Sequence, residues 1–230
     1  MNDKKGKLYI IATPIGNMED ITLRAINVLN SIDILACEDT RRTQKIFTNH
    51  KLAKPERILL YHEYNEKKAY LKVLDLLKEN KTIALLSDAG TPGISDPGYR
   101  IISSARDKGY DVEVIPGPNA VITALISSGL PCSSFTFKGF APKKKGQRKK
   151  FLEIEKELPH TLIVFESPYR IASFIQDAYE VLGNRLAAIC IELTKKFERI
   201  YRGYLEDLAE NIKEKKGLLR NIQINQECCI

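Results

Sequence analysis

The sequence has little that suits a membrane protein. None of its apolar runs approaches the ~18 residues that a membrane-spanning helix needs. The first seven residues, Met1–Lys7, lead into only a few apolar residues before Thr13 and Pro14, which is too short for the apolar part of a signal peptide. We therefore expect no membrane partner and a cytoplasmic protein.

Features of disulfide and metal frameworks are also missing. The chain has five cysteines, an odd number, and no Cys-x-x-Cys pair, so neither a disulfide framework nor a zinc site is indicated. Cys37 and Cys190 lie in apolar runs, where cysteine serves as a small buried hydrophobe. The three histidines, His50, His62 and His160, are scattered. We expect no metal site and a reducing compartment.

The glycine motifs of nucleotide-binding proteins are absent too, although one segment has a related composition. Ser87–Gly98 is rich in glycine and proline and follows the apolar run Lys81–Leu86. It lacks the Lys-Ser or Lys-Thr of a phosphate-binding loop, which disfavours an NTPase, and Ala12–Asn17 contains only one glycine. A plain tight turn remains the alternative. However, similar turns at 12–17, 87–98 and 116–120 each follow an expected strand, and ligands bind at the carboxyl ends of strands.

Alternating strand and helix patterns predict an α/β fold in two domains, residues 1–116 and 117–230, divided at Pro116–Pro118. In the first domain we expect a mostly parallel sheet covered on both faces, and in the second a mixed sheet. Expected strands are 8–12, 32–37, 58–60, 81–86, 112–115, 135–137, 161–166, 186–193 and 196–202. One helix is expected to begin near Thr22, whose hydroxyl can cap it. The other expected helices cover 63–80, 99–108, 119–128, 150–157, 168–182 and 204–215. In the helix over 63–80, the residues expected on the buried side are Leu71, Leu74 and Leu77.

Positive charge is concentrated in one stretch. The net charge is +7, and the residues from Lys138 to Lys150 include seven Lys or Arg and no acid. Such a stretch is either a solvated loop or a contact site for a polyanion.

Six motifs together closely resemble one family. They are Ala12–Asn17, Ala36–Arg41, Ser87–Gly98, Pro116–Ala120, Glu166–Arg170 and Glu192–Lys195. In this order they resemble the bacterial enzymes that methylate the ribose 2′-hydroxyl of a cytidine in the decoding centre of 16S ribosomal RNA (rRNA). These enzymes belong to the tetrapyrrole (precorrin) methylase superfamily, and the resemblance runs from about Lys7 to Gly203.

The resemblance implies that S-adenosylmethionine (SAM) binds in a cleft between the two domains. The residues that it assigns to the cofactor are Ile15, Leu86, Ser87, Asp88, Ile94, Asn119, Ala120, Glu166 and Leu193. It further implies 16S rRNA or the small ribosomal subunit as partner, and a homodimer. With an RNA substrate, the basic residues become candidate phosphate contacts: Arg41, Arg42, Lys143, Lys144, Lys145, Arg148, Lys149 and Lys150.

The chemistry leaves several points open. A ribose hydroxyl attacks well only after losing its proton, so a base or a nearby cation would help, and Glu166, Asp39 and Lys195 are candidates.

Two other functions are compatible with the sequence: the same fold acting on a small molecule or a protein side chain, or a non-catalytic RNA-binding protein. The tail 218–230 departs from the family pattern, which ends in a strand.

Overall fold

We describe residues 6–214 and 228–229 in a computed structural model. The chain forms two compact units, one ending at Asn119 and the other beginning at Ala120. The division lies three residues after the boundary expected from the sequence (119 against 116).

The first unit is built on a fully parallel sheet with the strand order β3-β2-β4-β1-β5. Its strands are β1 (Lys7–Ile11), β2 (Ile34–Cys37), β3 (Arg57–Leu60), β4 (Thr82–Leu86) and β5 (Asp111–Ile115). β4 and β1 are central, and their apolar sequences are buried on both faces, as a covered parallel sheet requires.

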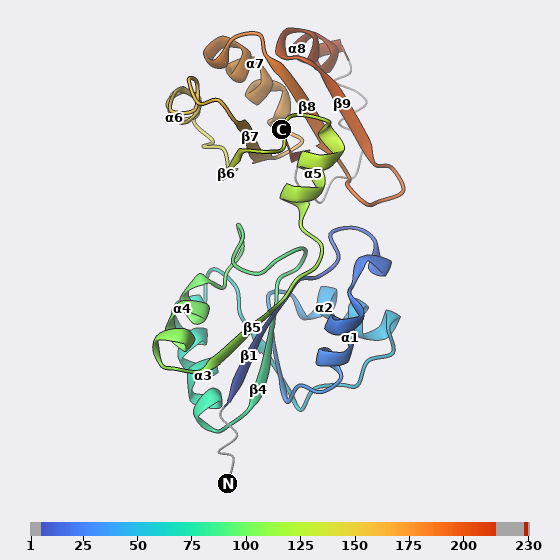
Figure 1. The fold of residues 1–230 in the computed structure, drawn as a ribbon, viewed down its shortest axis with the longest axis vertical. Helices are drawn as coiled ribbons and strands as arrows, with labels where there is room; N and C mark the ends of the chain where they lie inside the picture. The colour runs from blue at the N-terminus through green and yellow to red at the C-terminus, as the bar shows by residue number, and fades with distance from the viewer. Residues whose placement is uncertain (1–5, 215–227, 230) are drawn as a thin grey trace. The chain divides into compact units, whose positions relative to one another are not determined.

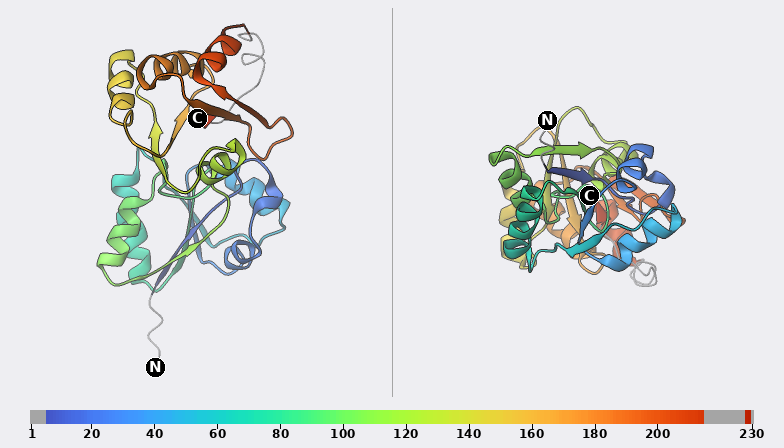
Figure 2. Two further views of the ribbon diagram at one scale, coloured as in Figure 1. Left: turned by 45° about the horizontal axis from the view of Figure 1, so that its top comes forward. Right: turned by 90° about the horizontal axis from the view of Figure 1, so that it is seen from below.

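Helices cover both faces of this sheet. They are α1 (Leu23–Leu29), α2 (Thr40–Asn49), α3 (Glu66–Lys78) and α4 (Tyr99–Asp107), with a short 3₁₀ helix, η1, at Met18–Asp20. α3 and α4 pack on the face that carries Leu8, Ile83 and Leu85, whereas α1 and α2 pack on the face that carries Leu35 and Leu86. Figure 1 and the view from below in Figure 2 show these two helix pairs on opposite sides of the sheet. The first unit is therefore doubly wound.

The second unit has a mixed sheet with the order β6-β7-β10-β8-β9. Its elements are α5 (Ala120–Ser128), β6 (Phe135–Phe140), α6 (Lys145–Glu153), β7 (Thr161–Glu166), α7 (Ile171–Leu182), β8 (Leu186–Ile191), β9 (Arg199–Tyr204), α8 (Leu205–Glu214) and β10 (Cys228–Cys229). β6 and β7 are parallel, and the other neighbours are antiparallel. α6, α7 and α8 lie in a row and share one core with β7 and β8 (Figure 2). The α/β class and the two sheet types agree with the sequence-based expectation.

Several local expectations are confirmed and others are wrong. Thr22 caps α1, because its Oγ1 accepts a hydrogen bond from the Ala25 amide at 3.1 Å. Cys37 and Cys190 are buried. Leu71, expected on the buried side of α3, is 50% exposed, because Val73 lies on the buried face in its place.

Two helices depart further from the elements expected from the sequence. α2 was not expected at all, and α6 begins at Lys145 rather than near Lys150. Of the tail 218–230, all but Cys228 and Cys229 lies outside the described residues.

Candidate functional site

The loops that follow the strands of the first unit meet at one edge of its sheet. We call residues 12–17, 38–39, 87–98 and 116–119 the strand-end loops; they follow β1, β2, β4 and β5. The chain passes from β4 to α4 on one face, and from the neighbouring strands β1 and β2 to α1 and α2 on the other. Such a change of direction between neighbouring parallel strands opens the crevice in which doubly wound proteins bind their ligands.

The loop after β4 is held firmly against the loop after β1. The Thr13 amide donates to the Gly90 carbonyl at 2.9 Å, and the Gly90 amide donates back to the Thr13 carbonyl at 3.0 Å. The Thr13 hydroxyl, which is fully buried, donates to the Ser87 carbonyl at 3.2 Å. Gly90 has a φ of +79°, which favours glycine. These bonds fix the backbone that a ligand would approach.

Asp88, in the same loop, joins β4 to the beginning of α2. Its Oδ1 accepts the Asp39 amide at 3.0 Å, and its Oδ2 lies 3.4 Å from Nε of Arg42. Burial raises the pKa of Asp88, while Arg42 opposes that rise. Each carboxylate oxygen still has acceptor capacity for a ligand. Arg42, expected to contact RNA, is therefore a partner of Asp88.

Asp39 is the N-cap of α2 and is held by Arg41. Its Oδ1 accepts the Arg41 amide at 2.8 Å, and its Oδ2 lies 2.7 Å from Nη2 of Arg41. These bonds to Arg41 lower the pKa of Asp39 to about 2. Asp39 is thus held as a carboxylate, which makes it a weak proton acceptor.

The loop after β5 approaches the same edge. The Asn119 amide group donates to the Thr91 hydroxyl at 3.4 Å, which connects this loop with the one after β4. A Cβ on Gly117 would lie 3.1 Å from Cβ of Ala12, so a larger residue at 117 would crowd this approach between the loops. The strand-end loops therefore bring together Ser87, Asp88 and Asn119.

The apolar residues assigned to the cofactor differ in exposure. The side chains of Ile15 and Leu86 are buried in the first unit and Leu193 is buried in the second, whereas Ile94 is 44% exposed. Ile94 is thus the one of these four with a side chain open to a ligand.

In the second unit, Glu166 ends β7 with no exposed surface. Its Oε1 accepts the Ser167 amide at 2.6 Å and lies 2.5 Å from Nη2 of Arg170. Its Oε2 has no hydrogen-bond partner among the described residues. Burial raises the pKa of this carboxyl, against the effects of the Ser167 amide and Arg170. An unpaired buried oxygen is costly and fits a position that awaits a ligand donor.

The turn after β8 contains unusual backbone. Glu192 and Thr194 have φ values of 54° and 64°, which are uncommon outside glycine, and they flank the buried Leu193. Lys195 is not a free cation, since its Nζ lies 2.8 Å from Oε1 of Glu192. Backbone strain of this kind concentrates at functional sites, and it supports a role for this turn.

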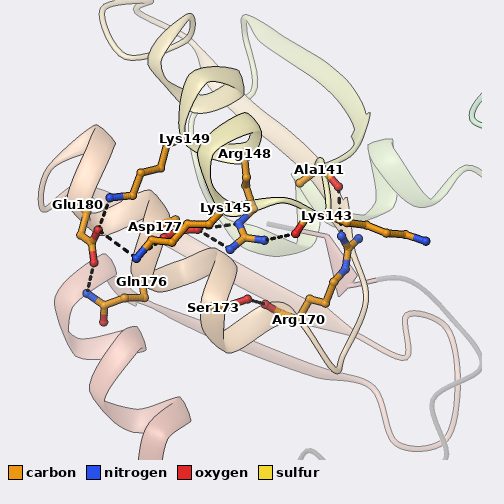
Figure 3. A network of polar contacts seen from close by, with 10 residues as sticks. All are labelled: Ala141, Lys143, Lys145, Arg148, Lys149, Arg170, Ser173, Gln176, Asp177 and Glu180. Carbon is orange, nitrogen blue, oxygen red and sulfur yellow. Dashed lines mark hydrogen bonds and ion pairs between the residues drawn. The ribbon is translucent and has the colours of Figure 1, made fainter.

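The basic stretch divides into two groups of side chains. Arg148 is 5% exposed and pairs with Asp177, while Lys149 pairs with Glu180 and Lys145 lies near both acids (Figure 3). The exposed members Lys143, Lys144 and Lys150 form no ion pair among the described residues. Sequence reasoning did not single out Arg170 or Asp177. The four-residue spacing between Glu166 and Arg170 could have indicated their ion pair. No local pattern in the sequence indicated the role of Asp177.

Two negative findings bear on the class of protein. Within residues 6–214 and 228–229, no helix is long and apolar enough to cross a membrane. In the same part of the chain, no three His, Cys, Asp or Glu side chains are grouped as metal ligands would be.

A doubly wound unit joined to a mixed α/β unit defines the class as a two-domain α/β protein, in which ligands are expected at the carboxyl ends of the parallel strands. The family model for tetrapyrrole (corrin/porphyrin) methylases matches residues 7–209. The chain belongs to this methylase family.

Curated relatives share much of its length. The chain is 48% identical over 212 residues to a protein of Halalkalibacterium halodurans, covering 92% of this chain and 73% of the relative. A relative from Thermotoga maritima is 41% identical over 213 residues, covering 93% and 95%. Both are named ribosomal RNA small subunit methyltransferase I.

Solved structures share the fold at lower identity. Diphthine synthase aligns with a TM-score of 0.72 and 11% identity, over 97% of this chain and 88% of that one. Uroporphyrin-III C-methyltransferase from Thermus thermophilus, complexed with S-adenyl homocysteine, aligns with a TM-score of 0.62 and 20% identity, over 97% and 94%.

Proposed function

We propose that this protein transfers a methyl group from SAM to the ribose 2′-hydroxyl of a cytidine in the decoding centre of 16S rRNA. The observation that carries the proposal is identity of 41–48% over more than nine tenths of the chain to relatives named ribosomal RNA small subunit methyltransferase I. The homodimer remains a prediction from the family resemblance, and the cytoplasmic location remains a prediction from the composition of the sequence.

The chain has residues that fit SAM in both units. In the first unit, Ser87, Asp88 and Asn119 offer polar groups on a backbone fixed by Thr13. In the second, Oε2 of Glu166, which has no partner within residues 6–214 and 228–229, offers an acceptor for a ligand hydroxyl or amino group. SAM supplies an already activated methyl group, so the protein has mainly to position the hydroxyl and the cofactor.

The three candidates for assisting the hydroxyl are no longer equivalent. Asp39 is held ionised by Arg41, and the ammonium of Lys195 is paired with Glu192. Glu166 has a raised pKa and an oxygen with no hydrogen-bond partner among the described residues, which are properties of a proton acceptor. We therefore infer that Glu166 is the strongest of the three.

RNA is favoured over a small molecule or a protein side chain by the exposed lysines. Lys143, Lys144 and Lys150 form no ion pair among the residues described, so their charges are available to phosphate. A neutral small molecule or a single protein side chain would not require such a set.

The substrate is tested by mapping ribose methylation in 16S rRNA by mass spectrometry. We expect one cytidine of the decoding centre to lose its 2′-O-methyl group in a strain that lacks this protein, and to regain it when the gene is restored. An unchanged methylation pattern would overturn the RNA substrate, and with it the proposed function.

A further inference from the structure

The loop between β6 and α6, residues 141–144, is held by two arginines that both bind backbone carbonyls. Arg170 donates through Nη1 to the Ala141 carbonyl at 3.4 Å, and Arg148 donates through Nη1 to the Lys143 carbonyl at 3.2 Å. Figure 3 shows the two guanidinium groups at either end of this loop. We call residues 141–144 the lysine loop.

Arg148 is itself fixed by a buried acid on α7. Its Nε and Nη2 lie 2.7 and 2.5 Å from Oδ2 of Asp177, and both side chains are almost completely buried. A buried pair of this kind is costly to disrupt on one side only, so it is a rigid connection between the two helices. The charge of Arg148 is therefore paired inside the protein.

The anchoring of carbonyls leaves the lysine side chains free. The Lys143 carbonyl faces Arg148, and the Lys144 carbonyl accepts the Arg148 amide at 2.9 Å. With their carbonyls bound inward, Lys143 and Lys144 are exposed, and in Figure 3 the Lys143 ammonium points away from the acids of α7. The loop therefore presents two ammonium groups from a fixed backbone.

We propose that Arg148 and Asp177 are positioning residues for the RNA substrate: their pair fixes the lysine loop so that Lys143 and Lys144 meet phosphates in a defined place. This inference rests on the proposed function. The sequence suggested Arg148 as a phosphate contact, whereas this inference gives it a role inside the protein. Fixing the loop in advance lowers the conformational entropy that RNA binding would otherwise lose.

The two possible roles of Arg148 predict opposite effects of Asp177→Asn. If Arg148 contacted phosphate directly, removing the acid would free a guanidinium and leave RNA binding unchanged or tighter. If the pair positions the loop, the same change weakens RNA binding, although the protein has become more positive. Arg148→Lys tests the same point, because lysine keeps the charge but cannot donate to both Asp177 and the Lys143 carbonyl in this geometry.

The experiment measures binding and methylation of small ribosomal subunits from a strain that lacks the protein. For Asp177→Asn and Arg148→Lys we expect binding about three- to tenfold weaker, with KM for the subunits raised by the same factor. We expect kcat and the SAM dissociation constant to stay within about twofold, because in both variants position 148 keeps the positive charge that lowers the pKa of Glu166.

The matched control is Glu180→Gln, which frees Lys149 on the exposed side of the same helix pair without touching the lysine loop. It should leave RNA binding unchanged or tighter.

Because Asp177→Asn could lower stability, the double variant Arg148→Met/Asp177→Leu replaces the pair by apolar groups and leaves no unpaired buried charge. It should weaken RNA binding as much as Asp177→Asn.

Weakening by both Asp177→Asn and the double variant, with SAM binding retained, supports the inference. Unchanged or tighter binding by Asp177→Asn, or normal binding by the double variant, overturns it. Failure of the wild-type protein to bind or methylate the subunits overturns the proposed function, and the inference with it.

Discussion

At the scale of single residues, the carboxylates of the site differ through their partners. Asp39 is bound by the side chain and amide of Arg41, which lowers its pKa. Glu38 and Asp88 are partly buried near one another, and burial raises the pKa of both. Glu166 combines complete burial with an oxygen that has no partner in the part of the chain that the structure describes. The same functional group thus serves as cap, as connector between loops, and as candidate ligand acceptor.

The low pKa of Asp39 predicts a pH dependence of stability. Its value falls from 3.8 to about 2 on folding, so the stabilisation is present above pH 4 and is lost as the pH falls toward 2. We expect Asp39→Asn to melt at a slightly lower temperature than the wild type at pH 7, because asparagine keeps the cap but not the charge. The difference should narrow below pH 4 in thermal unfolding, and added salt should reduce it. A difference that is the same at pH 6 and pH 3 would contradict this assignment.

At the scale of elements, the loop after β4 depends on glycine. Gly98 has a φ of +151°, and a Cβ there would lie 3.0 Å from the Gly93 amide nitrogen, within the same loop. The Gly98 amide donates to Oε1 of Glu66 at 3.1 Å, which connects the loop to α3. Any side chain at 98 would therefore displace the loop that carries Asp88 and Ile94.

Gly98→Ala should accordingly affect both stability and cofactor binding. The matched control is Gly109→Ala, since Gly109 has a φ of +74° but nothing within 4 Å of its Cβ position. We expect Gly109→Ala to cost about 1–2 kcal/mol of unfolding free energy through backbone strain alone. Gly98→Ala should cost more and should weaken SAM binding in calorimetry, whereas Gly109→Ala should leave it unchanged. Equal SAM affinity in both variants would show that the loop does not hold the cofactor.

Some of the helices and strands could be predicted from the sequence, and others could not. The parallel sheet followed from apolar runs alternating with helical patterns. α2 was missed because its buried residues are few, Thr43, Ile46 and Phe47, within an otherwise polar stretch. α6 was placed too late because its first turns are lysine-rich and resemble a loop. The pairing of Arg148 with Asp177 joins residues 29 positions apart, and no local pattern contains that information.

At the scale of the whole molecule, each unit by itself carries residues that the family resemblance assigns to the cofactor. That the loops after β1, β4 and β5 meet at one edge of the sheet could be predicted, because a turn containing glycine and proline follows each of these strands. The individual roles could not, since they depend on hydrogen bonds between distant residues, such as Asp88 with the Asp39 amide. The net charge of +7 fits an RNA partner, but five of the eight basic residues expected to bind RNA form ion pairs with acids: Arg41, Arg42, Lys145, Arg148 and Lys149.

The central claim is tested most directly by methyl transfer in a purified system. The wild-type protein is incubated with isotope-labelled SAM and small ribosomal subunits from the deletion strain, and the rRNA is digested and analysed by mass spectrometry. We predict one label per subunit, on the 2′-oxygen of a decoding-centre cytidine, and none on subunits from the parent strain, which already carry the methyl group. Absence of label from the rRNA, or label on a base or a ribosomal protein, would contradict the account.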